Sequence, residues 1–388
     1  MLTGNKFTKF ATLAVSAALL SFAATEASAT HFRYGTMSWT RSQANPLQVT
    51  FNVTEAWRST FTDSLTFSNG ASGSFNTATN RTTIGTFTDA NSESYTVFNT
   101  SITQTYPSAG VFNLLASSCC RISTLQNGNN DDQYNIRATV DLTQPFSTDV
   151  GGPVAQAPII VPLPKTTSGN FATFQLPFAD PDGDAMTVSV SPAGSGGSGL
   201  NTALPIAGAN MLSVSPTGLL SWDTSGTTLG QKYAIQLTVG ENDSASAVPV
   251  DFIIEISNDT ANQAPIVLGQ SLTLEVGDLL NTTIMGSDPD NGPVSPLTWN
   301  LDAITGPQTV ANASFDPLTQ MLLWDTTGYA LGVYTFFISN FDGAANGLGQ
   351  VVVNLTAASE VAEPGALAVI GLGLAGLVFA RRRKAAVC

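Results

Sequence analysis

The chain has 388 residues, of which only 11% are charged; acidic residues outnumber basic ones 28 to 14, giving a formal net charge of −14. A negative field of this size disfavours nucleic acid and anionic lipid as partners and favours cations, although an acidic surface also serves solubility. Three cysteines are too few for a disulfide framework, so the cores must form by packing, and the length suffices for two or three domains.

Residues 1–29 have the order of a secretory signal peptide. Lys6 and Lys9 precede an apolar stretch at residues 10–24, and small residues at 27–29 supply the A-x-A pattern that a signal peptidase cleaves. A buried N-terminal helix is the structural alternative. The order of charge, apolar core and cleavage pattern predicts export.

The next segment, residues 30–150, is predicted to be an N-terminal β domain. Its opening THFRYGTMSWT and its later FNLLASSCCRIS resemble N-terminal β modules that precede cadherin-like repeats in some surface proteins. Cys119 and Cys120 are adjacent, which allows either a vicinal disulfide or two thiols on opposite faces of a strand.

Motifs of enzymes are mostly absent. His31 is the only histidine, so the chain has no histidine cluster for zinc, no H-E-x-x-H and no G-x-S-x-G. The alternative is a catalytic pair of carboxylates of the glycosidase type, which the many acidic residues could supply. The sequence predicts a protein without catalytic residues that works by binding.

An internal repeat divides the rest of the chain into two modules, at residues 153–258 and 259–358. AQAPIIV returns as NQAPIVL, and GLLSWDTSG returns as QMLLWDTTG with Trp222 and Trp324 in register. Short segments rich in Val, Ile, Thr and Phe alternate with turn residues, which predicts all-β sandwiches of about one hundred residues each. We expect both indoles to pack between the sheets; a carbohydrate-stacking role is the alternative.

These motifs resemble the Ig-like and cadherin-like modules that are repeated in bacterial surface proteins. The resemblance covers roughly residues 153–358 and implies tandem β-sandwiches, while leaving the function open.

Alternating aspartates offer a candidate metal site. In DPDGD, Asp180, Asp182 and Asp184 can turn three carboxylates toward one point, as Ca²⁺ requires, and the second copy keeps only the first two positions. Resemblance to cadherin-like modules implies that linker carboxylates complete such a site. A solvated turn without metal is the alternative. The predicted calcium ligands are Asp180, Asp182, Asp184, Asp243, Asp259, Asp288, Asp290 and Asp342.

The tail, residues 361–388, holds a fifteen-residue apolar run at 366–380 followed by four basic residues. This run is shorter than the ~20 residues that span a bilayer comfortably, and the basic cluster would stay cytoplasmic. The layout resembles a PEP-CTERM sorting signal, processed by an exosortase of Gram-negative bacteria, although the usual Pro-Glu-Pro is here Ala-Glu-Pro. The residues that match this signal are Glu363, Pro364, Arg381, Arg382 and Arg383.

Together these features predict a non-enzymatic protein of the cell surface or extracellular polymer matrix of a Gram-negative bacterium. We expect an adhesive or matrix role, transient inner-membrane anchoring through the tail helix, and extracellular polysaccharide or surface proteins as partners. The alternative is a carbohydrate-binding or enzymatic N-terminal head displayed on two Ig-like spacers.

Overall fold

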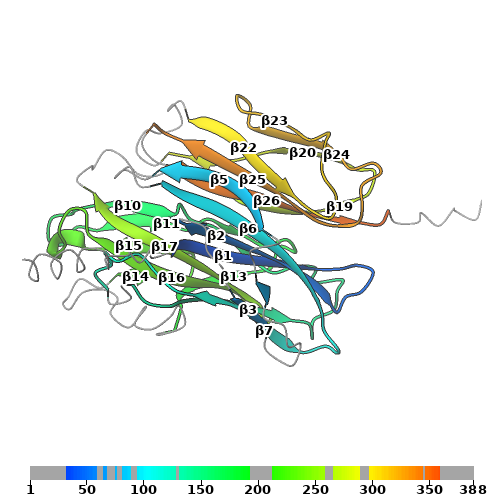
Figure 1. The fold of residues 1–388 in the computed structure, drawn as a ribbon, viewed down its shortest axis with the longest axis horizontal. Coiled ribbons are helices and arrows are strands. Elements are labelled where there is room, and N and C mark those ends of the chain that lie inside the picture. The colour runs from blue at the N-terminus through cyan, green and yellow to red at the C-terminus, as the bar shows by residue number, and fades with distance from the viewer. Residues whose placement is uncertain are drawn as a thin grey trace, which may run out of the picture.

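The computed structural model describes residues 32–58, 64–67, 75–76, 81–88, 94–127, 131–192, 212–257, 265–288, 297–343 and 346–358. Its elements are β-strands and one 3-10 turn at Thr224–Gly226, which confirms the all-β prediction (Figure 1). Among these residues no helix is long and apolar enough to cross a membrane. The predicted signal peptide and sorting tail lie outside the described residues.

The N-terminal module is an antiparallel β domain. Successive side chains of a strand point to opposite faces, so buried and less buried residues alternate along it. In β7, for example, Phe112, Leu114 and Ala116 are buried between less buried neighbours. Its strands are β1 (Phe32–Arg41), β2 (Gln48–Trp57), β3 (Ser64–Phe67), β4 (Phe75–Asn76), β5 (Arg81–Thr88), β6 (Ser94–Thr105), β7 (Val111–Ser118) and β8 (Tyr134–Asp141).

The two repeats have the same topology. In each repeat the second strand pairs in parallel with the last strand, which also forms a hairpin with the strand before it. The strands of the first copy are β9 (Val154–Ala155), β10 (Ile160–Pro164), β11 (Ala172–Gln175), β12 (Phe178–Ala179), β13 (Met186–Val190), β14 (Ser213–Val214), β15 (Leu219–Trp222), β16 (Lys232–Glu241) and β17 (Ala247–Ser257). Those of the second copy are β18 (Ile266–Val267), β19 (Gln270–Glu275), β20 (Leu279–Thr283), β21 (Gly286–Ser287), β22 (Thr298–Thr305), β23 (Ser314–Asp316), β24 (Met321–Asp325), β25 (Gly332–Phe341) and β26 (Asn346–Thr356).

Each copy is a two-sheet β-sandwich. The second sheet consists of β11, β15 and β14 in the first copy and of β20, β24 and β23 in the second. Trp222 and Trp324 are the equivalent residues of β15 and β24, with 2% and 0% of their surface exposed. The prediction that both indoles are core residues is confirmed.

The N-terminal module and the first repeat share one sheet. Strand β17 pairs with β16 along one edge; along its other edge it pairs with β10, with β1 at Gly35 and Thr36, and with β8. A buried ion pair crosses this junction, since the Arg121 guanidinium donates to both carboxylate oxygens of Asp251, with 2.8 Å between Nη1 and Oδ1. The first two modules therefore form a continuous structure.

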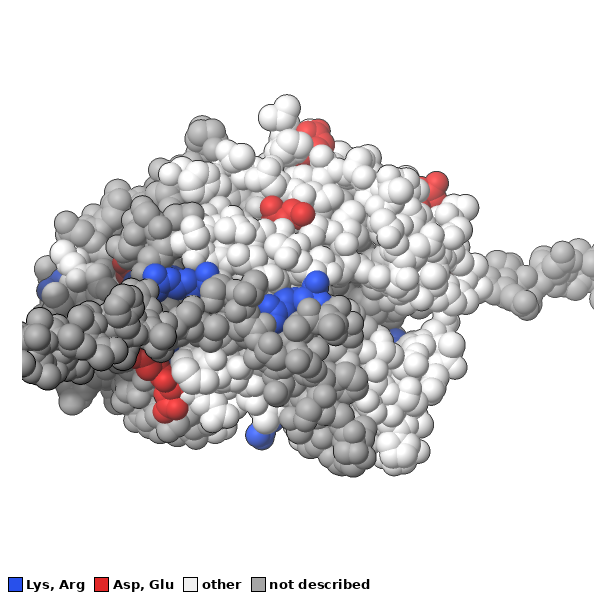
Figure 2. Space-filling model, viewed as in Figure 1, with Lys and Arg blue, Asp and Glu red and all other residues white. Residues whose placement is uncertain are grey.

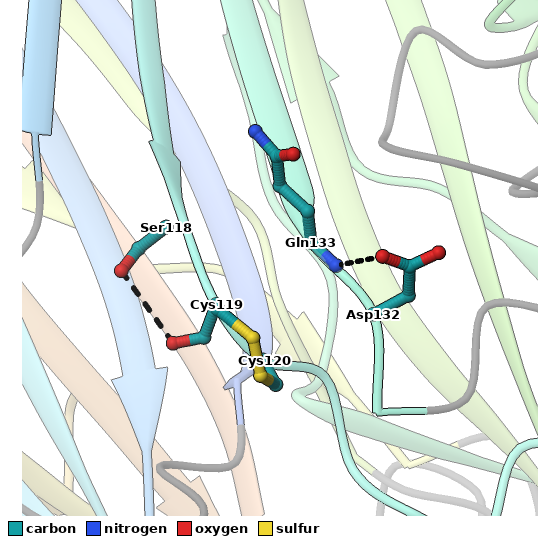
Figure 3. Close-up of a disulfide and its surroundings, with 5 residues drawn as sticks. All are labelled: Ser118, Cys119, Cys120, Asp132 and Gln133. Carbon is teal, nitrogen blue, oxygen red and sulfur yellow. Dashed lines mark hydrogen bonds between the residues drawn. A yellow bond between two sulfur atoms is a disulfide. The ribbon is translucent and has the colours of Figure 1, made fainter.

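Figure 3 shows that Cys119 and Cys120 form a vicinal disulfide, the first of the two alternatives left open by the sequence. The disulfide follows the end of β7 and directly precedes the buried Arg121. The carbonyl oxygen of Cys120 accepts a hydrogen bond of 2.9 Å from the backbone nitrogen of Phe32. This bond attaches the start of β1 to the segment that carries Arg121.

The second repeat packs against the N-terminal module, where Figure 1 places β22, β25 and β26 beside β5 and β6. Phe337 and Leu348 of the repeat join the main hydrophobic core. Next to them, the buried side-chain oxygen of Gln156 accepts a hydrogen bond from the backbone nitrogen of Gln350 at 2.9 Å. All three modules are thus in contact.

Replacing Trp324 with alanine should lower the free energy of unfolding by about 3–5 kcal/mol, because it leaves a cavity between Tyr329, Tyr334 and Phe336. Chemical denaturation of the purified variant measures this loss. A variant as stable as the parent would contradict the core role of the indole.

The substitution Arg121→Leu should cost about 3–5 kcal/mol, since it leaves the Asp251 carboxylate buried without its cation. The double variant Arg121→Leu with Asp251→Leu should recover most of this stability, whereas the control Arg137→Leu on an exposed side chain should stay within ~0.5 kcal/mol of the parent. Equal losses in the single and double variants would show that the ion pair is not the cause.

Candidate metal centre

The loop between β12 and β13 folds three predicted ligands toward one another. Oδ1 of Asp180 accepts hydrogen bonds from the backbone nitrogens of Asp182 at 2.8 Å and Asp184 at 3.2 Å. Gly183 adopts a φ of +80°, a left-handed conformation that glycine takes without strain. As a result, one carboxylate oxygen from each of the three aspartates lies within 4.8 Å of the others.

A second group of carboxylates shares Asp184 with the first. Glu241 at the end of β16 and Asp243 in the turn to β17 each place an oxygen within 4.8 Å of Asp184 and of each other. Glu241 is 8% exposed, and its Oε1 accepts no hydrogen bond from the described part of the chain, while Ser244 donates to its Oε2. Sequence analysis identified Asp243 but missed Glu241, although both lie in the GENDS segment.

The N-terminal module contributes a further carboxylate. Asp149, in the loop after β8, is 3% exposed, and neither of its oxygens accepts a hydrogen bond among the described residues. Its nearest cation is Arg41, whose Nη1 lies 3.9 Å from Oδ2. The next two residues, Val150 and Gly151, donate backbone hydrogen bonds of 2.9 and 3.1 Å to Oδ2 of Asp182. The acidic cluster therefore lies at the junction of the first two modules.

Burial and mutual repulsion disfavour the ionised form of this cluster. Burial raises the pKa of Asp149 to about 7, that of Asp180 to about 6 and that of Glu241 to about 8. Neighbouring carboxylates also contribute to these raised pKa values, whereas the Arg41 guanidinium opposes the rise at Asp149 and hydrogen bonds oppose it at Asp180 and Glu241. Burial likewise raises the pKa of Asp182 and of Asp184.

The other predicted ligands do not complete a second centre within the part of the chain that the structure describes. Asp288 is buried and Asp342 is half-buried, and neither belongs to a group of converging carboxylates there. Asp259 and Asp290 lie outside the described residues, as do Glu363, Pro364, Arg381, Arg382 and Arg383.

The donor set of the cluster consists of oxygen atoms. Five carboxylates converge in two groups that share Asp184, and neither group contains a histidine or cysteine. Hard cations such as Ca²⁺ prefer six to eight oxygen ligands, whereas zinc favours nitrogen and sulfur. The residues present fit a calcium ion.

Two sequence families match parts of the chain. The N-terminal family of integrin beta-like protein A-E matches residues 33–143, which is the first module. The PEP-CTERM protein-sorting motif matches residues 360–384, as predicted from the tail, and implies export and cell-surface sorting with processing by exosortase-type machinery. No curated protein matches the sequence.

Solved structures resemble the chain at low identity. Human protocadherin-24 EC1-2 is 15% identical with a TM-score of 0.20, covering 53% of this chain and 99% of its own. The human desmocollin-1 ectodomain is 12% identical with a TM-score of 0.21, covering 81% of this chain and 66% of its own. An endo-fucoidan hydrolase of glycoside hydrolase family 107 is 16% identical with a TM-score of 0.20, covering 76% of this chain and 39% of its own.

In cation-free buffer, the free energy of unfolding should fall as the pH rises from about 5 to about 8. The pKa values of Asp149 and Glu241 are raised in the folded state, so the stability that they contribute is present below their ordinary pKa near 4 and is lost as the pH passes through about 7 and 8. Denaturant titrations at several pH values with a chelator measure this slope. Glu241→Gln should flatten it, and a parent protein with no slope would contradict the assignment.

Proposed function

We propose that the chain is a non-enzymatic extracellular or cell-surface protein whose first two modules are stabilised by calcium, with an adhesive or matrix-associated role. Support comes from the sorting motif, the tandem Ig-like sandwiches and the sparse enzyme motifs of the sequence. The sorting motif also supports a Gram-negative source with transient inner-membrane anchoring before processing. Extracellular polysaccharide and other surface proteins are the proposed partners.

The calcium proposal rests mainly on the buried carboxylate of Glu241, whose Oε1 lacks a hydrogen bond among the described residues. Burying a carboxylate is costly unless a cation or hydrogen bonds compensate its charge. The repelling carboxylates that share its site make the cost larger. A calcium ion at this point would neutralise the cluster and satisfy the free oxygen.

The position of the cluster suggests what the ion does. Asp182 already joins the first two modules through its hydrogen bonds to Val150 and Gly151, and Asp149 comes from the loop directly before them. An ion between these segments would hold the end of the N-terminal module against the first repeat. Extracellular calcium sites bind at about 10⁻⁴ to 10⁻³ M, so the junction would stiffen after export, where calcium is abundant.

Calcium should bind the purified mature chain in calorimetry and raise its melting temperature, with a gain of about 2.7 kcal/mol at a hundredfold excess over the dissociation constant. The double variant Asp182→Asn with Asp184→Asn, and separately Glu241→Gln, should lose this response. Asp316→Asn is the control, since its carboxylate accepts hydrogen bonds from its own turn at Leu318 and Thr319. Absence of binding at millimolar calcium would refute the calcium proposal.

A further inference from the structure

A polar cavity of about 270 Å³ lies between the N-terminal module and the second repeat. This volume is near the lower end of the range of about 300–1,000 Å³ in which proteins bind small molecules. One wall belongs to β1, β2 and β6, and the other to the segment after β22 and the start of β25. The residues that line it are Thr40, Arg41, Ser42, Gln48, Thr50, Ser101, Thr103, Gly306, Pro307, Leu331, Gly332 and Val333.

The first wall is a row of hydroxyl groups. Thr40 pairs directly opposite Thr50, and Thr50 opposite Thr103, so the three side chains stand on the same face of the sheet. Ser101 and Gln48 lie two residues along β6 and β2 and therefore share this face. The hydroxyls of Thr50 and Thr103 are 3.0 Å apart and hydrogen-bonded.

One hydroxyl of this row has no partner. Thr40 is 3% exposed, and its Oγ1 makes no hydrogen bond among the described residues. A buried polar atom in a native protein is normally paired with protein, water or ligand. This oxygen has almost no accessible surface of its own, so the hydroxyls that the row offers to a ligand are those of Thr50, Ser101 and Thr103.

The opposite wall is mainly apolar, and its close packing requires glycine at two positions. A Cβ atom on Gly306 would lie 2.3 Å from the Tyr334 ring, and one on Gly332, whose φ is +132°, would lie 2.8 Å from Pro307. Larger residues at these points would push Pro307 away from the start of β25. Pro307, Leu331 and Val333 thus present a preformed apolar surface to the hydroxyl row.

Among the described residues that line the cavity, Arg41 is the one charged residue, and its guanidinium is held elsewhere. Arg41 pairs opposite Val49 on the other face of the sheet, and its guanidinium donates to the backbone oxygens of Pro46, Gln144 and Asp149. No acidic residue lines the cavity. Figure 2 shows that charged side chains are also sparse on this view of the surface.

We propose that this cavity binds a neutral saccharide unit of an extracellular polysaccharide. Hydroxyl groups both donate and accept hydrogen bonds, so the threonine row can pair with the hydroxyls of a sugar, while the apolar wall covers a ring face. A carboxylated or sulfated sugar would find no cation to compensate its charge. This inference goes beyond calcium-dependent stabilisation and does not require it.

The full mature chain is titrated with cellohexaose and mannohexaose as neutral probes and with hexagalacturonic acid as the anionic probe, using calorimetry and saturation-transfer NMR. We expect at least one neutral probe to bind and the anionic probe to bind at least 10-fold more weakly. Failure of both neutral probes at millimolar concentration, or stronger binding of the anionic probe, would overturn the proposal. Repeating the titration with chelator separates this result from the calcium proposal.

Thr50→Val and Thr103→Val replace a hydroxyl at the cavity with a methyl group of similar size and should each weaken neutral-probe binding by about 3- to 10-fold, as expected for one lost hydrogen bond. Thr86→Val is the matched control, because Thr86 and Thr96 form a hydroxyl pair of 3.2 Å outside the cavity. Melting curves verify that each variant is folded. Unchanged binding in both cavity variants would show that the probe binds elsewhere.

Discussion

The buried ion pair between Arg121 and Asp251 determines how the modules are joined. Asp251 lies at the middle of β17 with no exposed surface, and an unpaired charge there would be strongly destabilising. Gln236 of β16 adds a hydrogen bond of 3.0 Å to the same carboxylate and another of 2.7 Å to the backbone oxygen of Asn135 in β8. The charge of Asp251 is therefore compensated where the N-terminal module, which carries Arg121, packs against the edge of β17.

The acidic cluster is a consequence of this junction. Because β8 and β17 share a sheet, the loop after β8 brings Asp149 to the end of the first repeat, where the aspartate loop and the β16–β17 turn already meet. Burial, and to a smaller extent mutual repulsion, makes this convergence unfavourable without a counter-ion, as the raised pKa values of Asp180 and Glu241 indicate. The packing that joins the modules and the proposed need for calcium thus have the same origin.

The second repeat is attached by a different kind of contact. Between its outer sheet face and β1, β2 and β6, apolar side chains such as Phe337 alternate with buried polar ones, and Oγ of Ser38, Oγ1 of Thr335 and Oε1 of Gln350 have no hydrogen-bond partner among the described residues. Interfaces between domains of one chain are commonly more polar than cores, which suits an interface that opens into a polar cavity.

The sequence by itself determined the local structure of this protein. Period-two alternation and turn residues predicted an all-β chain, the repeated motifs predicted two equivalent sandwiches, and the apolar neighbours of Trp222 and Trp324 predicted their burial. The spacing of Asp180, Asp182 and Asp184 indicated convergence, because a loop of five residues with a glycine brings alternating side chains together whatever surrounds it.

Only the tertiary structure decided which distant residues meet. Glu241 and Asp149, which the sequence did not single out, lie beside Asp180, Asp182 and Asp184, whereas the predicted linker ligand Asp259 lies outside the described residues. The pairing of β17 with β1 and the two walls of the cavity were likewise not predictable. Each depends on contacts between residues far apart in the chain, and local spacing carries no information about how separate sheets align.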